Sequence, residues 1–581
     1  MRRILRRHPP ILRPEAPLPE RAASLLRRLE ALRDAYGADA GSSKLAILEA
    51  LSARRLSTSS QVLRLHECLC FLRAYPDDRR VLGQVEGMLA AFARRPDLRR
   101  HRAALADTGI AGTEIRFRFF ARTAVWLARR WPERLLVDWP EFDDKERLVP
   151  FLPLLVHYGE TPALDEWDMS VRAWIRRLKG RDETDAAFLI RRLASLEADA
   201  MVRERIYEDL QIPLRLTPGP ETPSRTRARH ASSPVVFVSE GIPRSRPRLP
   251  QDARQTPRGV REVRGDEARS LIGLARAAMI ARQRDLDIFS YASPHDVRLV
   301  EWDGGLQFAC FGALPERRLL LESVYGFLTL VNGVPVGYVL ASALFGSSEI
   351  AYNVFDTYRG GESAKIYGRV MATVRHLFRS DAFTVFPYQL GQDNREAIDS
   401  GAWWFYQKIG FVPQNAEALR LMRSELARMK RNPRHRSSAA TLRALADHNV
   451  YYFLSRARWD VIGADYFPDV GLKITDYMAG RFGSDREKAT RVCAMEAARA
   501  LGLRSLAGFS PGERTAWDRW APLVLILPGL DRWSHAGRRA LVAIVRAKGG
   551  RRESDFVTLF DRHRPLRRAI LRLTGWKPPA R

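Results

Sequence analysis

The pattern of apolar and polar positions divides the chain into three parts. In the first part, apolar side chains recur three or four positions apart, as in residues 45–51 and 62–72, which is typical of helices with one buried face. A Pro-Asp-Asp break separates 62–72 from a similar run at 81–92, so we expect helical hairpins there. We interpret residues 1–214 as an irregular, all-helical domain.

Residues 266–430 alternate between helical and strand-like patterns. The strands are expected at 297–302, 306–311, 324–331, 334–343, 349–355 and 382–386, and the helices at 268–284, 363–379 and 401–409. Asn332-Gly333 stands between two apolar runs, which is the strongest short signal for a β-hairpin. This order predicts an α+β domain whose mixed, mostly antiparallel sheet carries helices on its faces.

After residue 430 the pattern is helical again. Helices are expected at 437–454, 484–501, 512–527 and 536–548. The last segment, 562–573, is basic and amphipathic, and it suits either an anionic surface or an ordinary solvated helix face. We interpret 431–581 as a second all-helical domain, so that helical domains flank the central sheet on both sides.

Residues 215–265 have a different composition from the parts on either side. Nine prolines lie from Pro213 to Pro257, and arginines alternate with Ser and Thr over the same stretch. Few apolar residues are available to pack, which predicts an extended, mobile tether between domains. The alternative is a basic arm that binds an anionic partner.

Charge and length change this picture in two ways. The 581 residues exceed one ordinary domain, and their 46% hydrophobic content excludes a wholly disordered chain. Lys and Arg number 96 against 67 Asp and Glu, a net charge of +29, which favours a polyanion or a phosphate-bearing cofactor as partner. No helix-turn-helix, zinc-finger or ribonucleoprotein motif accompanies that charge.

The cysteine content and the apolar runs bear on the cellular compartment of the protein. Four Cys in so long a chain do not form a disulfide framework, and the spacing of His66, Cys68 and Cys70 does not suit a metal site. The N-terminus lacks the apolar core of a signal peptide, and the longest apolar run, 521–530, is too short to span a bilayer. We therefore expect a cytoplasmic protein without a transmembrane segment or a metal.

The residues that predict a ligand-binding function concentrate in 352–371. A strand ends there in a Gly-containing turn, and a helix begins at once. Backbone N–H groups of such a turn and the positive end of the helix dipole together suit a pyrophosphate. Arg359 stands where it can add a full positive charge.

Two motifs in this part resemble those of the GNAT superfamily of acyl-CoA N-acyltransferases. The segment 359–364 is similar to the family's pyrophosphate loop, Arg/Gln-x-x-Gly-x-Gly/Ala, except that Glu362 occupies the central Gly position. The segment 402–411 is similar to the family's Ala-x-x-x-Tyr-x-Lys-x-Gly-Phe, with Tyr406 at the Tyr position. The resemblance covers residues 266–423 and leaves the flanking parts unexplained.

The resemblance implies acetyl-CoA or another acyl-CoA as co-substrate and an unidentified amine as acceptor. It implies a cofactor site at Asn353, Val354, Phe355, Arg359, Gly360, Gly361, Ser363 and Ala364. Tyr406 would give a proton to the departing thiolate, and Glu349 would take the amine proton through water. The alternatives are a core aromatic for Tyr406 and an ordinary strand-end carboxylate for Glu349.

Two other functions remain open at this point. A catalytically degenerate GNAT fold would serve as a binding module, and Glu362 in the phosphate loop favours it. A basic nucleic-acid-binding protein would account for the net charge, with the tether and the C-terminal helix as contacts for the polyanion. These functions do not exclude one another, since a tether can bring an enzyme to a polyanion.

Overall fold

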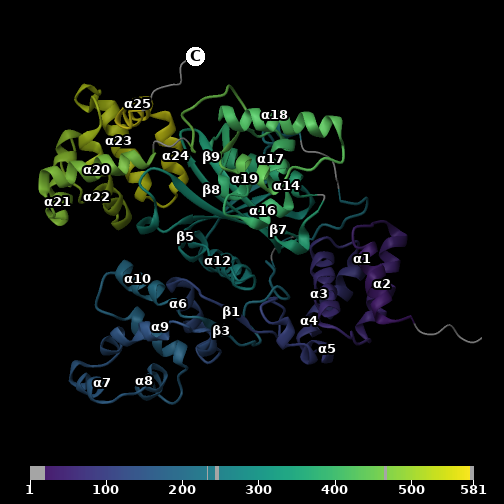
Figure 1. The fold of residues 1–581 in the computed structure, drawn as a ribbon. Coiled ribbons are helices and arrows are strands. Elements are labelled where there is room, and N and C mark those ends of the chain that lie inside the picture. Colours follow the sequence, from purple (N-terminus) through teal and green to yellow (C-terminus); the bar gives the residue numbers. More distant parts are fainter. Residues whose placement is uncertain are drawn as a thin grey trace, which may run out of the picture.

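The computed structural model describes residues 20–231, 233, 235–242, 248–360, 362–463 and 467–575. Within this part the fold is α+β, with a nine-stranded sheet between N-terminal and C-terminal helical regions (Figure 1). The sequence therefore predicted the fold class correctly. None of the helices in these residues is long and apolar enough to cross a membrane.

The N-terminal helices form hairpins, as the sequence predicted. They are α1 (Ala22–Leu32), α2 (Ala38–Ser52), α3 (Ser59–Ala74), α4 (Arg79–Ala91) and α5 (Pro96–Arg100). The hydroxyl of Thr58 accepts from Gln61 N at the start of α3, and Asp78 accepts from two N–H groups at the start of α4. The Pro-Asp-Asp break thus ends one helix and caps the next.

A small sheet interrupts the helices that follow. Strands β1 (Ile115–Phe117) and β2 (Leu135–Val137) both pair antiparallel with β3 (Leu214–Leu216). The helices around it are α6 (Ala121–Arg130), α7 (Pro162–Glu166), α8 (Val171–Leu178), α9 (Asp185–Ala194) and α10 (Ala200–Leu210). The prediction of an all-helical region is wrong here, because a three-residue strand carries too little alternation to register in a sequence.

Residues 217–231, which we call the strap, pack against the N-terminal helices. Arg73 of α3 donates to three backbone carbonyl oxygens of the strap. Arg225 and Arg229 form ion pairs with glutamates of α3 and α4. The prediction of a solvated tether is wrong for this segment, because groups of the neighbouring helices satisfy its charges. Residues 232, 234 and 243–247 of the predicted tether lie outside the described part.

The central sheet runs in the order β11-β12-β10-β9-β8-β7-β6-β5-β4 across the described residues. Its strands are β4 (Gly259–Val263), β5 (Ala292–Glu301), β6 (Leu306–Ala313), β7 (Ser323–Val331), β8 (Val334–Leu344), β9 (Ser347–Val354), β10 (Ala382–Val385), β11 (Val412–Pro413) and β12 (Val450–Phe453). Neighbours are antiparallel except β9 and β10, which are parallel. This confirms the mixed, mostly antiparallel sheet.

The β7–β8 hairpin has the predicted turn. Asn332 and Gly333 adopt positive φ angles of 51° and 78°, which suits the twist of a two-residue hairpin. The Asn332 side chain also donates to Ala74 O and accepts from Val236 N. The hairpin tip is therefore docked on the N-terminal helices.

The sheet is longer at both ends than the sequence predicted. Strand β4 comes from the predicted tether and pairs with β5. Strand β12 lies within 437–454, for which a single helix is expected. Helix α19 (Ala439–Ala446) ends early instead, and β12 pairs with β10 and β11. The β-branched and aromatic run at 450–453 suits a strand, and its neighbours decide its conformation.

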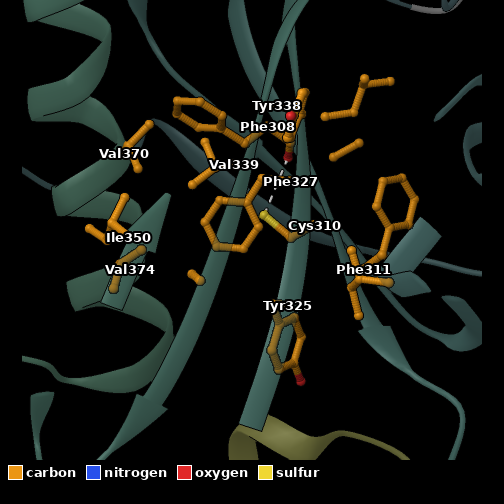
Figure 2. Close-up of a cluster of buried hydrophobic side chains, with 14 of the residues drawn as sticks. Phe308, Cys310, Phe311, Tyr325, Phe327, Tyr338, Val339, Ile350, Val370 and Val374 are labelled. Carbon is orange, nitrogen blue, oxygen red and sulfur yellow. Dashed lines mark hydrogen bonds between the residues drawn. The ribbon is translucent and has the colours of Figure 1, made fainter. Parts of the chain in front are cut away.

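Helices cover both faces of the sheet. The remaining helices of this region are α11 (Leu249–Asp252), α12 (Gly265–Ile280), α13 (Asp287–Ser290), α14 (Ser363–Phe378), α15 (Pro387–Leu390), α16 (Arg395–Ser400), α17 (Ala402–Ile409) and α18 (Ala416–Arg431). Phe308, Phe327 and Val339 of the strands point toward Val370 and Val374 of α14 (Figure 2). On the other face, the ring of Phe289 in α13 packs against Tyr338 of β8.

The C-terminal helices pack against the sheet rather than standing apart. They are α20 (Phe467–Phe482), α21 (Arg486–Ala500), α22 (Pro511–Ile526), α23 (His535–Gly549), α24 (Glu553–Arg562) and α25 (Arg564–Leu573). Buried Lys548 pairs with buried Glu553 at 2.6 Å and donates to the carbonyl of Glu322 before β7. Helix α25 buries its apolar face, which includes Leu566 and Ile570, so that face is not free to enter a membrane.

Candidate functional site

The two parallel strands separate soon after they pair. Only Ser347–Glu349 of β9 pair with β10, opposite residues 382–384. Residues 350–354 of β9 continue beside β8 alone. The gap lies at the carboxyl end of the parallel pair, where open sheets commonly bind ligands. We call the gap beside 350–354 the β9–β10 opening.

Three buried polar atoms without partners border this opening, two on the α14 face of the sheet and one on the other face. The Tyr352 hydroxyl, the Asn353 Oδ1 atom and the Tyr367 hydroxyl make no hydrogen bond within the described residues. Tyr367 belongs to α14, and its ring lies 5.5 Å from that of Tyr352 and 5.6 Å from that of Tyr406. Most buried polar atoms in proteins are paired, so these three atoms leave hydrogen-bonding capacity at the opening that the described residues do not use.

Glu349 lies at the closed end of the opening. Its carboxylate accepts from Ser342 Oγ of β8 at 3.0 Å. Burial raises the pKa of Glu349 to about 7, and repulsion from Glu322 adds to the shift while the Ser342 hydrogen bond opposes it. A carboxyl group that is half ionised near neutral pH can accept and release a proton under ordinary conditions.

Tyr406 lies across the sheet from Glu349. It is on α17, nearly buried, and its ring contacts those of Tyr367 and Phe411. Burial raises the pKa of Tyr406, which keeps its hydroxyl protonated at neutral pH. Glu349 and Ser342 share one sheet face, whereas Tyr406 packs on the opposite face.

The end of β9 lies beside the opening. Asn353 and Val354 pair with β8, and the Val354 carbonyl accepts from Arg359 Nε at 3.3 Å. Phe355 donates its N–H to Val336 O at 3.0 Å, and its ring lies 3.6 Å from the guanidinium of Arg282. The side chain of Phe355 is thus fixed by packing.

The turn after β9 is open, but its arginine is already paired. Arg359 contacts the carboxylates of Asp356 and Glu396, the first at 2.9 Å. A side chain at Gly360 would meet nothing within 4 Å, so the turn is accessible there. Gly361 lies outside the described residues. The positive charge that the sequence assigns to a phosphate is therefore shared with two carboxylates.

The first turn of α14 offers fewer free donors than expected. Ser363 returns both its N–H and its hydroxyl to Gly360 O. Ala364 follows in the first turn, where N–H groups have no partner inside the helix. Glu362 makes no side-chain cap, and its carboxylate lies 3.5 Å from Lys365 Nζ. Its charge also contributes to the raised pKa of Tyr352, after burial and Tyr406.

Several residues of the site were missed at the sequence level. Tyr352, Tyr367 and Ser342 are ordinary core and strand residues by pattern. The register of β8 with β9 brings Ser342 to Glu349, and the packing of α14 on the sheet brings Tyr367 to Tyr352. For Ser342 the signal was present, because the Asn-Gly turn fixes the register of its strand with β7. Arg282 lies beside Phe355, and burial and neighbouring Arg225 lower its pKa to about 9.

The described residues contain no group of three His, Cys, Asp or Glu placed to hold a metal ion. All four cysteines are buried and free, and Cys310 lies in the sheet core (Figure 2). No family model matches the chain, and no curated protein or solved structure matches it significantly. The functional proposal therefore rests on the geometry of the opening together with the motif residues.

Proposed function

We propose that the protein is an acyl-CoA-dependent N-acyltransferase whose acyl-CoA enters the β9–β10 opening. The observation that carries this proposal is the separation of two parallel strands beside three buried polar atoms without partners, two on one sheet face and one on the other. A chain of amide groups, such as pantetheine, supplies both donors and acceptors for such atoms. The free edge of 350–354 offers backbone groups to the same ligand.

The turn that follows β9 fits the phosphate end of this co-substrate in part. Gly360 leaves space above the turn, and the start of α14 contributes a partial positive charge. Acyl-CoA would supply the activated acyl group as a thioester. The identification of this region with a GNAT-like fold belongs to the same proposal, and it rests on the motif residues and on the strand order.

Glu349 and Tyr406 each carry out one proton transfer, from opposite faces of the sheet. Glu349, held by Ser342, takes the proton of the attacking amine as the C–N bond forms. Tyr406 gives its proton to the sulfur as the C–S bond breaks, and its high pKa suits a donor. Glu349 gains one proton and Tyr406 loses one, so the net charge of the protein is unchanged. Proton exchange with water then restores both side chains to their starting states.

A second candidate function is a binding module that does not turn over its ligand. Arg359 is paired with Asp356 and Glu396, and Glu362 adds another negative charge beside the turn. Such a site holds a phosphate less firmly than one with an unpaired cation. Binding and turnover must therefore be measured separately.

The direct test is calorimetric titration of the full chain with CoA and acetyl-CoA, followed by thiol release from acetyl-CoA in the presence of a panel of primary amines. We expect binding of both, and thiol release with at least one amine. Tyr406→Phe is expected to bind nearly as well and to release thiol roughly 10²–10⁴ times more slowly. Binding without release would favour the second candidate, and absence of binding would refute both.

A further inference from the structure

Helix α18 presents an unusual density of positive charge. It is an amphipathic helix that packs its apolar side, which includes Ala418 and Met422, onto the body of the protein. Residues 416–436 carry seven Lys and Arg and two Glu, so this short segment contributes +5 to the net charge of +29. The seven cations are Arg420, Arg423, Arg428, Lys430, Arg431, Arg434 and Arg436.

Most of these cations are exposed and have no carboxylate partner. Arg428 pairs with Glu425 at 3.1 Å, and it is the one member that forms an ion pair within the described residues. Arg420, Arg423 and Lys430 are exposed and make no side-chain contact with an acid there. Their spacing of three and seven residues puts them on one side of the helix.

A buried carboxylate fixes the shape of this surface. Glu425 is 1% exposed and accepts from Ser437 Oγ at 2.5 Å and from His435 Nε2 at 3.0 Å. Ser437 in turn accepts from the indole N–H of Trp404 in α17. These bonds hold the loop after α18 against the helix, so Arg434 is presented beside the exposed face rather than on a free tail.

We propose that α18 and its following loop, residues 416–436, form a docking surface for the phosphate backbone of a nucleic acid. A row of unpaired cations along a fixed helix gains free energy by releasing the counterions of a polyanion. The helix, about 24 Å long at 16 residues, reaches several consecutive phosphates. The proposal does not depend on the acyltransferase function, because it concerns a different surface and a different ligand.

The chemistry of the surface favours a nucleic acid over a membrane. An amphipathic helix that binds a bilayer inserts its apolar face, but α18 has packed that face against the protein. What remains outside is a charged face suited to phosphates that stay in water. Figure 1 shows α18 along the outer side of the molecule, at the opposite end of the view from α8.

Two other segments rich in arginine compare with this surface in different ways. In the strap, Arg225 and Arg229 are paired with glutamates. Arg73 of α3 donates to backbone carbonyl oxygens of the same segment. In α25, Arg567 is paired with Asp460, but Arg564, Arg568 and Arg572 are exposed and form no ion pair within the described residues. The strap therefore does not match the polyanion contact that the sequence assigns to the tether, and α25 is the competing surface against which α18 is tested.

The test is binding of the full chain to a labelled RNA hairpin and a labelled DNA duplex, measured by fluorescence anisotropy across a salt series. The triple variant R420E/R423E/K430E is compared with R176E/R177E/R181E on and just after α8. The control changes the net charge equally and also replaces exposed arginines that form no ion pair in the described residues. Thermal unfolding confirms that both variants fold.

We expect wild type to bind both probes and the α18 variant to bind at least about tenfold more weakly, with a salt slope smaller by about 2–3, since each phosphate contact contributes about 0.9. The α8 control is expected to stay within about threefold. Equal loss in both variants, unchanged binding in the α18 variant, or no binding by wild type at low salt would overturn the proposal. So would binding to phosphatidylglycerol vesicles alone, or a loss confined to the α25 variant R564E/R568E/R572E.

Discussion

The central sheet is paired without interruption from β4 to β9, which we call the continuous side. It is divided where β9 leaves β10, beside residues 350–354, which we call the divided side. Buried tyrosine hydroxyls differ between the two sides. On the continuous side, the buried Tyr325 hydroxyl of β7 donates to Asp296 at 2.5 Å and accepts from Ser554 N at 2.8 Å. On the divided side, the hydroxyls of Tyr352 and Tyr367 are equally buried and have no partner within the described residues. The Tyr325 hydroxyl is satisfied within the protein, whereas those of Tyr352 and Tyr367 are left for the proposed ligand.

The largest effect is expected from a change in chemistry on the divided side. Glu349→Gln keeps the shape of the side chain and removes the proton acceptor, so turnover should fall roughly 10²–10⁴-fold. Because the pKa of Glu349 is raised to about 7, the wild-type rate should rise with pH through about 7 as the carboxylate forms. The pH–rate profile of acetyl-CoA consumption measures both. A Gln variant with the wild-type rate and profile would remove Glu349 from the mechanism.

On the continuous side, Tyr325→Phe should lower the stability of the fold and leave CoA binding unchanged. The change leaves Asp296 without one donor and Ser554 N without its acceptor, and both atoms are buried. We expect the free energy of unfolding to fall by about 1–3 kcal/mol, as measured by denaturant titration. The affinity for CoA should stay unchanged. Weaker CoA binding in this variant would show that the two sides are not independent.

The raised pKa of Glu349 also predicts a pH dependence of stability. Between the usual carboxyl range and about pH 7, the folded protein holds a proton on Glu349 that the unfolded chain has released. The folded state therefore loses stability as pH rises through this window. Compared with Glu349→Gln, the wild type should lose about 2–3 kcal/mol more between pH 5 and pH 8. If the stability of the two proteins changed equally with pH, the raised pKa of Glu349 would be contradicted.

The smallest expected effect on stability belongs to Tyr352→Phe on the divided side. The variant loses a hydroxyl that has no partner in the described residues, so its stability without ligand should be unchanged or greater by up to about 1 kcal/mol. CoA binding should weaken, because the ligand loses a hydrogen-bond partner. This outcome is the reverse of that for Tyr325→Phe, which serves as the matched control. Lower stability with unchanged CoA binding would mean that the hydroxyl has a structural partner.

Local chemistry explains the parts of the fold that the sequence predicted. The Asn332-Gly333 turn requires positive φ angles at both positions, and few residue types supply them. The strand, turn and helix around Arg359 follow from hydrophobic periodicity in the same way. Glu349 and Tyr406 could be named from motif positions, because those positions depend on the order of elements along the chain.

The parts that the sequence missed depend on partners far away in the chain. Arg73 binds the strap at Thr226, 153 residues further on, so composition alone predicted a tether. Strand β12 forms because β10 and β11 offer it an edge, although a helix precedes it. The neutralised charge of Arg359 depends on Glu396 of α16, which no local pattern connects to the turn.

Hydrogen–deuterium exchange with and without CoA tests the central claim most directly. The account predicts that bound CoA slows exchange in peptides covering 350–354, whose outer edge has no neighbouring strand, and in the turn that follows them. Peptides covering β7, which pairs on both sides, should exchange equally with and without CoA. Protection confined to another part of the molecule, or no protection at saturating CoA, would contradict the assignment of the β9–β10 opening as the acyl-CoA site.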